Sequence, residues 1–162
     1  DPESQGRVKV QFVWQEEQNK TTNWIRVRSL DSGKSEIVLK NRGFVFVPEE
    51  NDQVIVCFEL ANPSRPYVSG SMFNEKNGYG GGRNNSIKSI ITRSGHTLIF
   101  DDTEGGENII LKDKSGNELM FKTSEESIEI TAQESLFLNA KKLFINIEDT
   151  ISQVSFQNWR ID

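Results

Sequence analysis

Short apolar segments separated by polar turns follow one another through residues 86–147. Within each segment apolar and polar side chains nearly alternate, as in a strand with one covered face. The phrase Ser94–Phe100 (SGHTLIF) returns 21 residues later as Ser115–Phe121 (SGNELMF), a spacing we interpret as about three strand-plus-turn units. No segment is long enough to build a core alone, so each strand needs cover from a neighbouring strand or from another chain.

Two arrangements satisfy this pattern. The strands could form a hairpin meander within one chain, with the acidic stretch 101–106 as one of the turns. Alternatively, several chains could wind around one another and bury their apolar faces jointly, which also removes exposed sheet edges. The segments expected to be strands are Thr97–Phe100, Ile109–Leu111, Leu119–Phe121, Ile128–Ile130, Leu136–Leu138 and Phe144–Ile147.

The first half of the chain predicts a small barrel of the OB type, with five short strands and no helical periodicity. Val8, Val10, Phe12 and Trp14 should share one face of the first strand, and Ile25 and Val27 should point inward from the second. Val54, Val56, Phe58 and Leu60 should share a face of the fourth. A short helix and an irregular loop both remain open for residues 31–40. The five strands are expected at residues 7–14, 24–28, 43–48, 53–60 and 67–72.

A glycine- and asparagine-rich stretch divides the chain. Such a composition cannot form a core, and no GxxxxGK[ST] pattern follows, so a linker is favoured over a phosphate-binding loop. The sequence therefore predicts a barrel at residues 1–73, a linker at 74–86 and a strand-rich needle at 87–162, all of it β structure.

The search for reactive groups finds no catalytic constellation. His96 is the one histidine and stands where the second repeat copy has Asn117, so it is interpreted as a turn residue rather than a metal ligand. Asp101, Asp102 and Glu104 lack calcium-loop spacing. Cys57 lies in an apolar strand and is expected to be a buried free thiol. We therefore expect a structural protein rather than an enzyme, with no metal and no cofactor.

An OB barrel also suggests single-stranded nucleic acid binding through exposed aromatic side chains. Trp24, Arg26 and Arg28 share a strand face, and Arg42 and Phe44 lie nearby in the sequence. Against this, the net charge is −5, and residues 1–72 hold 9 basic and 10 acidic side chains. A monomeric nucleic-acid-binding OB module is the alternative from another functional class.

No apolar run approaches the roughly 20 residues that span a bilayer, and the first residues carry no signal-peptide pattern. We expect a chain that acts in the cytoplasm as part of an assembly, and its abrupt start suggests the end of a longer protein.

Several ordered motifs resemble the VgrG and phage baseplate central spike family of contractile injection systems. The opening Gly6–Trp14 (GRVKVQFVW), the block from Gly43 to Val54 with Pro48, and the ending Asn62–Asn74 (NPSRPYVSGSMFN) resemble that family's barrel. Lys88–Asp102 and Gly106-Glu107 resemble the entry into its triple-stranded β-helix. The resemblance covers about residues 6–147.

The resemblance implies a homotrimeric spike in which three chains form one intertwined β-helical needle. It would cap the inner tube of an injection machine, pierce a target envelope, carry effectors or a tip protein, and be ejected into the target cell or the medium. Type VI secretion is favoured, with a phage or phage-like tail baseplate as the alternative. Implied partners are an Hcp-like tube protein, baseplate components, a PAAR-type tip protein and, transiently, the pierced membrane, with no nucleic acid.

Within such a needle, the apolar side chains should meet near one axis while Lys112, Glu118, Lys122, Glu129 and Lys141 stay solvated. The expected trimer core comprises Ile128, Ile130, Leu136, Leu138, Ile145 and Ile147, and a tip protein would dock near Phe156 and Trp159. The chain departs from the family in having no lysozyme-like insertion, no preceding hub domain and no His-x-His tip motif, so neither cell-wall hydrolysis nor a tip metal is implied.

Overall fold

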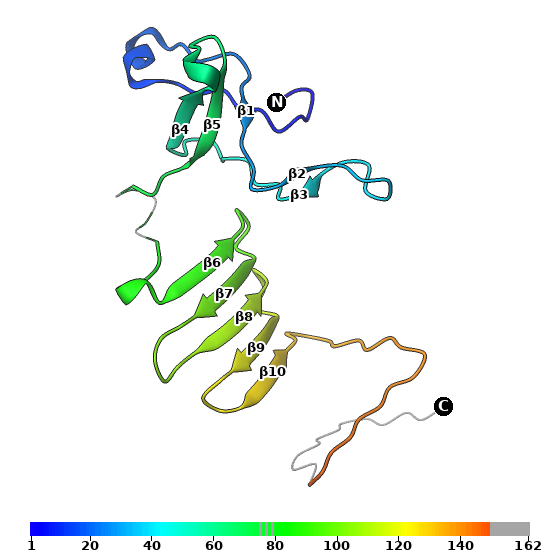
Figure 1. Ribbon diagram of the computed structural model, residues 1–162. Helices are drawn as coiled ribbons and strands as arrows, with labels where there is room; N and C mark the ends of the chain where they lie inside the picture. Colours follow the sequence, from blue (N-terminus) through cyan, green and yellow to red (C-terminus); the bar gives the residue numbers. More distant parts are fainter. Residues whose placement is uncertain (75, 77, 79, 150–162) are drawn as a thin grey trace. The chain divides into compact units, whose positions relative to one another are not determined.

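The computed structural model describes residues 1–74, 76, 78 and 80–149, and these divide into two units between Ile87 and Lys88 (Figure 1). The described residues are mostly strands, turns and extended chain, with three short 3-10 helices, so the expected all-β class is confirmed. No helix among them is long and apolar enough to cross a membrane.

The first unit is built on a three-stranded sheet. Strands β1 (Arg26–Val27), β4 (Val54–Phe58) and β5 (Pro66–Ser71) lie in the order β1-β5-β4, with β1 parallel and β4 antiparallel to β5. A separate pair, β2 (Ser32–Gly33) and β3 (Arg42–Gly43), forms a hairpin arm. Val68 is fully buried and Ile25 is 6% exposed, and no other described hydrophobic residue is buried. The core of this unit is therefore thin.

The first predicted strand is shorter than expected. Val8 pairs with Ile25 in an isolated bridge, and Val8, Val10 and Phe12 are half-buried, as the alternation predicts. The prediction is wrong for Trp14, which is 72% exposed and stacks on the Phe12 ring at 4.5 Å. The reason is that the Gln15 side chain accepts a hydrogen bond from the Phe12 amide (3.2 Å), and a 3-10 helix, η1 (Val13–Gln18), begins there.

Other parts of the barrel also depart from five continuous strands. Residues 31–40 form no helix but enter the short β2–β3 arm, and after Gly43 the apolar run Phe44–Val47 is exposed. In β4 a bulge between Ile55 and Val56 shifts the register, and η2 (Glu59–Ala61) follows with a left-handed Leu60 (φ 51°). Val54 and Val56 are half-buried as predicted, whereas Phe58 and Leu60 are 41% and 89% exposed.

Two smaller features complete this unit. Cys57 is free but only half-buried, because it lies beside the bulge rather than in a packed core. Beyond β5, η3 (Arg83–Asn85) is a single turn that begins after Gly82, whose φ is +68°.

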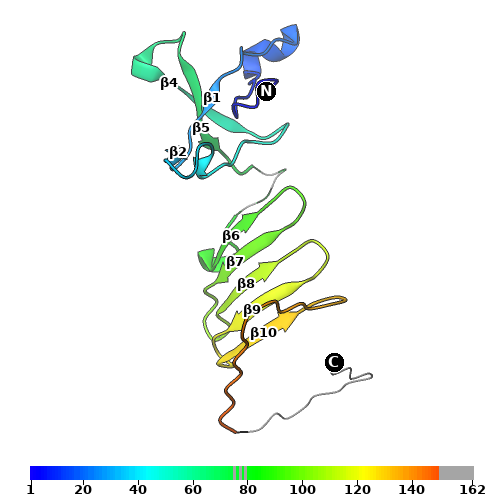
Figure 2. The same cartoon turned by 90° about the vertical axis from the view of Figure 1, so that its right-hand side faces the viewer.

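The second unit is an antiparallel meander of five-residue strands (Figure 2). The strands are β6 (Ile87–Ile91), β7 (Thr97–Asp101), β8 (Asn108–Lys112), β9 (Glu118–Lys122) and β10 (Ser127–Thr131), and their order in the sheet follows the chain. The predicted turns at 101–106, 113–117 and 123–126 lie between them. Within one chain, these strands therefore form the hairpin meander, which is the first of the two arrangements that the sequence allows.

The 21-residue repeat corresponds to two strands and two turns, not to three units as the sequence suggested. It superimposes β7 on β9 residue for residue, from Thr97 and Glu118 onward. The preceding turns also match, because Thr92 N–H donates to the His96 carbonyl (2.9 Å) as Asp113 N–H does to that of Asn117 (3.0 Å). An even number of strands per repeat keeps both copies running in the same direction on the same face.

No strand is found in the described part of the chain after Thr131. The expected strands Leu136–Leu138 and Phe144–Ile147 are extended but unpaired, and this segment leaves the edge of the sheet beyond β10 (Figure 1). Apolar alternation is present there, but a strand also needs a neighbouring backbone with which to exchange hydrogen bonds. No described segment of the same chain supplies one.

Candidate functional site

One face of the meander is entirely apolar from β7 to β10. Because side chains alternate along a strand, the register between the strands places every second residue of each strand on this face. Leu98 lies opposite Leu111, which lies opposite Leu119 and then Ile130, and a parallel row runs from Phe100 to Ile128. We call these eight side chains the apolar face: Leu98, Phe100, Ile109, Leu111, Leu119, Phe121, Ile128 and Ile130.

This face has no cover within the described chain. Six of its members are between 39% and 64% exposed, and the most exposed are Ile128 (64%) and Ile130 (60%). A soluble monomer rarely leaves a contiguous apolar patch of this kind open. Fully burying such a side chain contributes about 1.5–3 kcal/mol, so covering the whole face is a large driving force for association.

The predicted trimer-core residues Ile128 and Ile130 lie on this face. The prediction did not include the other six members of the face, which the register places beside them: Leu98, Phe100, Ile109, Leu111, Leu119 and Phe121. The signal that could have found them is the repeat itself. Phe100 and Phe121 occupy equivalent positions in its two copies, and once the turns are placed, alternation assigns β8 to the same face.

The opposite face carries the charges. Lys122 pairs with Glu129 on β10 (Nζ–Oε2 2.8 Å) and with Glu125 in the turn (3.6 Å), and Lys112 pairs with Glu118 (3.4 Å). These contacts raise the pKa of Lys122, chiefly through the Glu129 hydrogen bond, and lower the pKa of Glu129 for the same reason. The charged side chains of these strands therefore lie on the face opposite the apolar face, beside a central row of Ile99, Ile110 and Met120.

The other predicted core residues lie on the extended segment beyond β10. Leu136 and Leu138 are 57% and 68% exposed, and Ile145 and Ile147 are 71% and 50% exposed. The structure of one chain does not bring them onto the apolar face. Phe156 and Trp159, proposed for tip-protein docking, lie outside the described residues.

The extended segment is anchored where it leaves the sheet. The Gln133 amide donates to Asn117 Oδ1 (2.9 Å), and its side-chain Nε2 donates to the Gly116 carbonyl (3.0 Å). Asn117 in turn donates from Nδ2 to Asp113 Oδ2. The difference between the two repeat copies thus has a structural reason, since the asparagine of the second copy serves both its own turn and the outgoing chain.

Residues considered for metal or catalytic roles occupy turns. The His96 amide donates to Thr92 Oγ1 (3.1 Å), in agreement with its interpretation as a turn residue. Asp101 Oδ1 accepts from the Thr103 amide (2.9 Å), and hydrogen bonds from Thr103 lower the pKa of Asp101. Across the residues that the structure describes, no group of three or more His, Cys, Asp or Glu side chains is placed to hold a metal.

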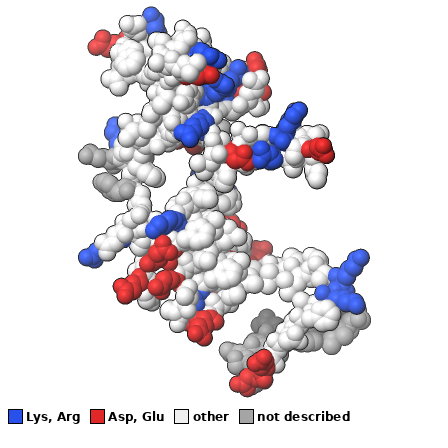
Figure 3. All heavy atoms as spheres, in the orientation of Figure 1, with Lys and Arg blue, Asp and Glu red and all other residues white. Residues whose placement is uncertain are grey.

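Charged and aromatic residues of the first unit are distributed over its surface. With Ile25 and Val27 directed inward, Trp24, Arg26 and Arg28 are exposed on the other side of the strand. Arg42 does not join them in an open basic surface, because it pairs with Asp31 (2.6 Å). Figure 3 shows acidic and basic side chains interspersed on the visible face of this unit.

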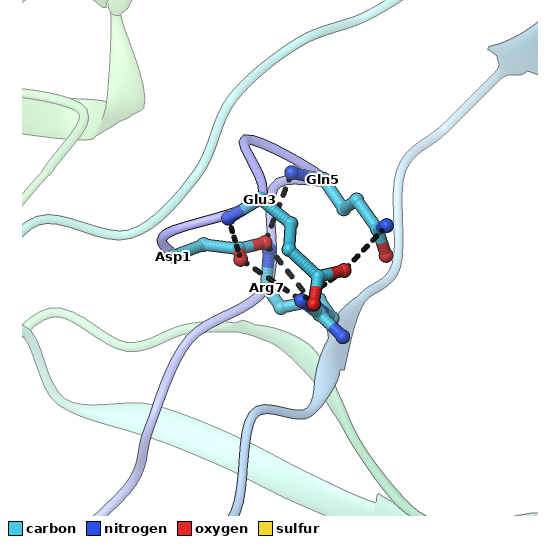
Figure 4. Close-up of polar contacts among 4 residues, drawn as sticks. All are labelled: Asp1, Glu3, Gln5 and Arg7. Atoms are coloured by element: carbon cyan, nitrogen blue, oxygen red, sulfur yellow. Dashed lines mark hydrogen bonds and ion pairs between the residues drawn. The ribbon is translucent and has the colours of Figure 1, made fainter.

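The loop that precedes the first pairing residue is organised by one carboxylate (Figure 4). Asp1, whose side chain is 6% exposed, accepts from the amides of Glu3 (3.0 Å), Gln5 (2.9 Å) and Arg7 (3.0 Å). The Arg7 guanidinium binds both oxygens of the same carboxylate, at 3.2 and 3.0 Å. These bonds position Gly6-Arg7, where the family-like opening motif begins, and sequence reasoning did not identify Asp1.

Comparison with known proteins agrees with this architecture. Residues 1–73 match the family model of the type VI secretion system/phage-baseplate injector OB domain. Two similar proteins are the type VI secretion system spike proteins VgrG1b and VgrG1c of Pseudomonas aeruginosa, 28% and 29% identical over 79% and 80% of this chain. The spike protein VgrG5 of the same organism is 35% identical over 44% of the chain.

The matched region is a small part of each relative. It spans 17% of VgrG1b, 18% of VgrG1c and 9% of VgrG5. The matches to VgrG1b and VgrG1c extend well beyond the OB domain into the strand-rich half of this chain. The resemblance to the VgrG and phage baseplate spike family is therefore confirmed.

Proposed function

We propose that this chain, which resembles the VgrG and phage baseplate spike family and carries its injector OB domain at residues 1–73, is a structural component of a trimeric spike in a contractile injection apparatus. The observation that carries the proposal is the apolar face, eight side chains on one side of a repeated sheet with no cover in the described chain.

The area that one chain exposes supports association. Its accessible surface is 14803 Å², and its mass is 18.4 kDa. Two separate globules of half that mass would together expose only about 10,000 Å². Copies of the chain that covered one another's apolar faces would remove part of this area from water.

The trimer is the assembly that the family resemblance favours. Three copies around one axis would bury the apolar face and leave the charged pairs of Lys112 and Lys122 in solvent. The extended residues 132–149, with their exposed leucines and isoleucines, would then find backbone partners in neighbouring chains, as in an intertwined β-helix.

The role in injection follows from such a shape. A stiff needle transmits force without needing a reactive group, so we propose that the trimer caps the inner tube, pierces the target envelope and carries effectors or a tip protein. Its base would contact an Hcp-like tube protein, and a PAAR-type protein would dock near Phe156 and Trp159. Assembly would take place in the cytoplasm, before ejection into the target cell or the medium.

A second candidate is a phage or phage-like tail spike, because the matched OB family includes phage baseplates as well as type VI secretion systems. The genes beside the coding sequence distinguish the two. Tail-tube, tape-measure and capsid genes would favour the phage apparatus, and sheath and membrane-complex genes of secretion would favour the other.

Light scattering coupled to size-exclusion chromatography tests the trimer. We expect a mass of about 55 kDa, three times that of one chain, which persists on dilution because the interface is apolar. A stable monomer of 18.4 kDa would contradict the proposal. In that case, tight binding of single-stranded DNA would favour the OB nucleic-acid-binding alternative.

A further inference from the structure

A cavity of about 500 Å³ lies on the first unit, between β1 and the turn that joins β4 to β5. Residues 23–26 form one wall, and residues 63–66 form the other. The Trp24 side chain and the two prolines of the turn supply apolar surface, whereas Arg26 and Arg65 supply charge. Nothing in the assembly described above uses this cavity.

Two guanidinium groups converge on a single carboxylate oxygen at the cavity. Arg26 Nη2 and Arg65 Nη2 each lie 3.2 Å from Oε2 of Glu59. Arginine is well suited to carboxylates because its planar fork donates parallel hydrogen bonds. One glutamate occupies only part of this donor set, and both arginine side chains remain more than half exposed, at 73% and 53%.

A third cation lies against Trp24, one of the residues that line the cavity. The Lys9 ammonium lies 5.0 Å from the centroid of the Trp24 ring, within the range of a cation–π contact. The residue Trp24 is 37% exposed, so part of it remains open to an apolar group. Two guanidinium groups on one carboxylate leave an excess of positive charge at a cavity with partly apolar walls.

Backbone hydrogen bonds close the turn that carries Glu59 and Arg65. The Glu59 amide donates to the Arg65 carbonyl (3.0 Å), and within the turn Asn62 N–H donates to Glu59 (3.0 Å) and Arg65 N–H to Asn62 (2.9 Å). Leu60 and Ala61 both have positive φ, 51° and 57°, which non-glycine residues adopt only where their surroundings enforce it. The backbone positions from which these two side chains extend are thus fixed before any ligand arrives.

We propose that this cavity is a binding site for the carboxylate side chains of an acidic protein segment that also carries an apolar residue. The incoming carboxylate takes the place of Glu59 between Arg26 and Arg65, and the apolar residue packs against Trp24 and the prolines. Glu59 is thereby an internal occupant that weakens the site until a stronger acidic ligand displaces it.

The charge balance favours an acidic protein segment over a polynucleotide. Nucleic-acid affinity comes from neutralising many phosphates along a basic stripe, and residues 1–72 contain more acidic than basic side chains. A small region of excess positive charge, bordered by tryptophan and proline, can bind a few carboxylates of a peptide. The site does not depend on the oligomeric state, because every residue that forms it belongs to one copy of the first unit.

Fluorescence anisotropy with a labelled acetyl-Glu-Glu-Leu-Glu-Glu-amide peptide and the full chain tests the proposal at low ionic strength. We expect saturable binding that Arg65→Ala or Arg26→Ala weakens by about tenfold, since each removes a charge-assisted contact. Glu59→Gln should tighten binding roughly threefold to tenfold, because a neutral amide competes less well for the guanidinium groups. Arg65→Lys keeps the charge but loses the fork, and it should bind with intermediate affinity.

Matched controls separate this site from general attraction of anions. Arg42→Ala removes the same charge from an arginine that is also exposed and paired with a carboxylate, and it should leave peptide affinity unchanged. Glu36→Gln is the equivalent control for Glu59→Gln. Circular dichroism melting of each variant shows whether it remains folded.

Three results would overturn the inference. The first is the absence of saturable peptide binding in both the natural chain and Glu59→Gln. The second is an equal loss with Arg42→Ala and Arg65→Ala, which would indicate diffuse charge attraction. The third is tighter binding of a ten-nucleotide oligothymidylate than of the peptide, which would assign the surface to nucleic acid.

Discussion

Asn117 and His96 occupy equivalent positions in the two copies of the repeat, but they make different contacts. The first copy has His96 at the equivalent position, whose amide closes the turn on Thr92. In the second copy the amide of Asn117 donates to Asp113 (2.9 Å) and its side chain also holds Asp113, while Asn117 Oδ1 accepts from Gln133. The carboxamide can do this because it carries both a donor and an acceptor.

The pKa of Asp113 reports on this contact. It lies below the model-compound value of 3.8, first because of the Asn117 side-chain hydrogen bond. A depressed pKa contributes stability that is present above 3.8 and is lost as the pH falls through the folded-state pKa. We expect Asn117→Ala to raise the pKa of Asp113 toward 3.8, as followed by carboxyl NMR titration.

Asp101 provides the internal control for that titration. Its pKa is lowered by hydrogen bonds from Thr103, which do not involve Asn117. In the Asn117→Ala variant the pKa of Asp101 should remain depressed. If the pKa of Asp113 were unchanged, its depression would have to arise from the backbone amides alone.

The glycines in the two repeat turns set the geometry of the connections into β7 and β9. Gly95 and Gly116 both have strongly positive φ, at +89° and +94°, where an L side chain is strained. We expect Gly95→Ala and Gly116→Ala each to lower the free energy of unfolding by about 1–2 kcal/mol. Gly116→Ala should cost slightly more, because its new Cβ would meet Gln133 Nε2 at 3.2 Å.

Gly106→Ala is the matched control in a neighbouring turn. Gly106 is outside the positive-φ region, and a Cβ there would meet nothing closer than the Thr103 carbonyl at 3.8 Å. Urea unfolding should therefore show little change for this variant. An equal loss in all three variants would contradict the conformational argument.

The apolar face makes a prediction for the sheet as an element. Ile130→Asp or Ile128→Asp should break the trimer, because three copies of the charge would meet near one axis without a partner. Light scattering should then give the mass of a monomer. Ser127→Asp adds the same charge to β10 on the other face, opposite Lys122, and should leave the trimer intact.

The extended segment makes a separate prediction. Leu138→Asp should also dissociate the assembly if residues 132–149 pack between chains. A trimer that survived Leu138→Asp but not Ile130→Asp would limit the interface to the meander.

At the scale of the molecule, stability should depend on association. Within the described chain only Ile25 and Val68 are buried hydrophobic residues, far too few to stabilise a 162-residue chain by itself. If folding is coupled to trimer formation, mass action makes the melting temperature rise with protein concentration. We expect an increase of several degrees between micromolar and hundred-micromolar chain, and a constant value would contradict the coupling.

Alternation and turn residues were sufficient to predict much of the structure from the sequence. They located β4, β5 and the strands β7 to β10, the inward positions of Ile25 and Val27, and the turns of the meander, because these depend on local geometry and on side-chain period. The ordered motifs, from Gly6-Arg7 to Phe73-Asn74, were sufficient to identify the family resemblance. The repeat indicated self-similar β structure but not how many strands it contained.

Only the tertiary structure decided the features that depend on distant partners. Trp14 and Leu60 continue an alternating pattern in the sequence, yet both leave the strand path: Trp14 lies in η1, which begins at the Gln15 hydrogen bond, and Leu60 lies in η2 with a left-handed backbone. Leu136 and Ile145 have the alternation of strands, but no described segment of the same chain supplies a backbone for them to pair with. The complete apolar face required the register between strands, and the contact of Arg26 with Glu59 joins residues 33 positions apart. Local pattern determines which way a side chain can point, whereas only packing determines what it meets.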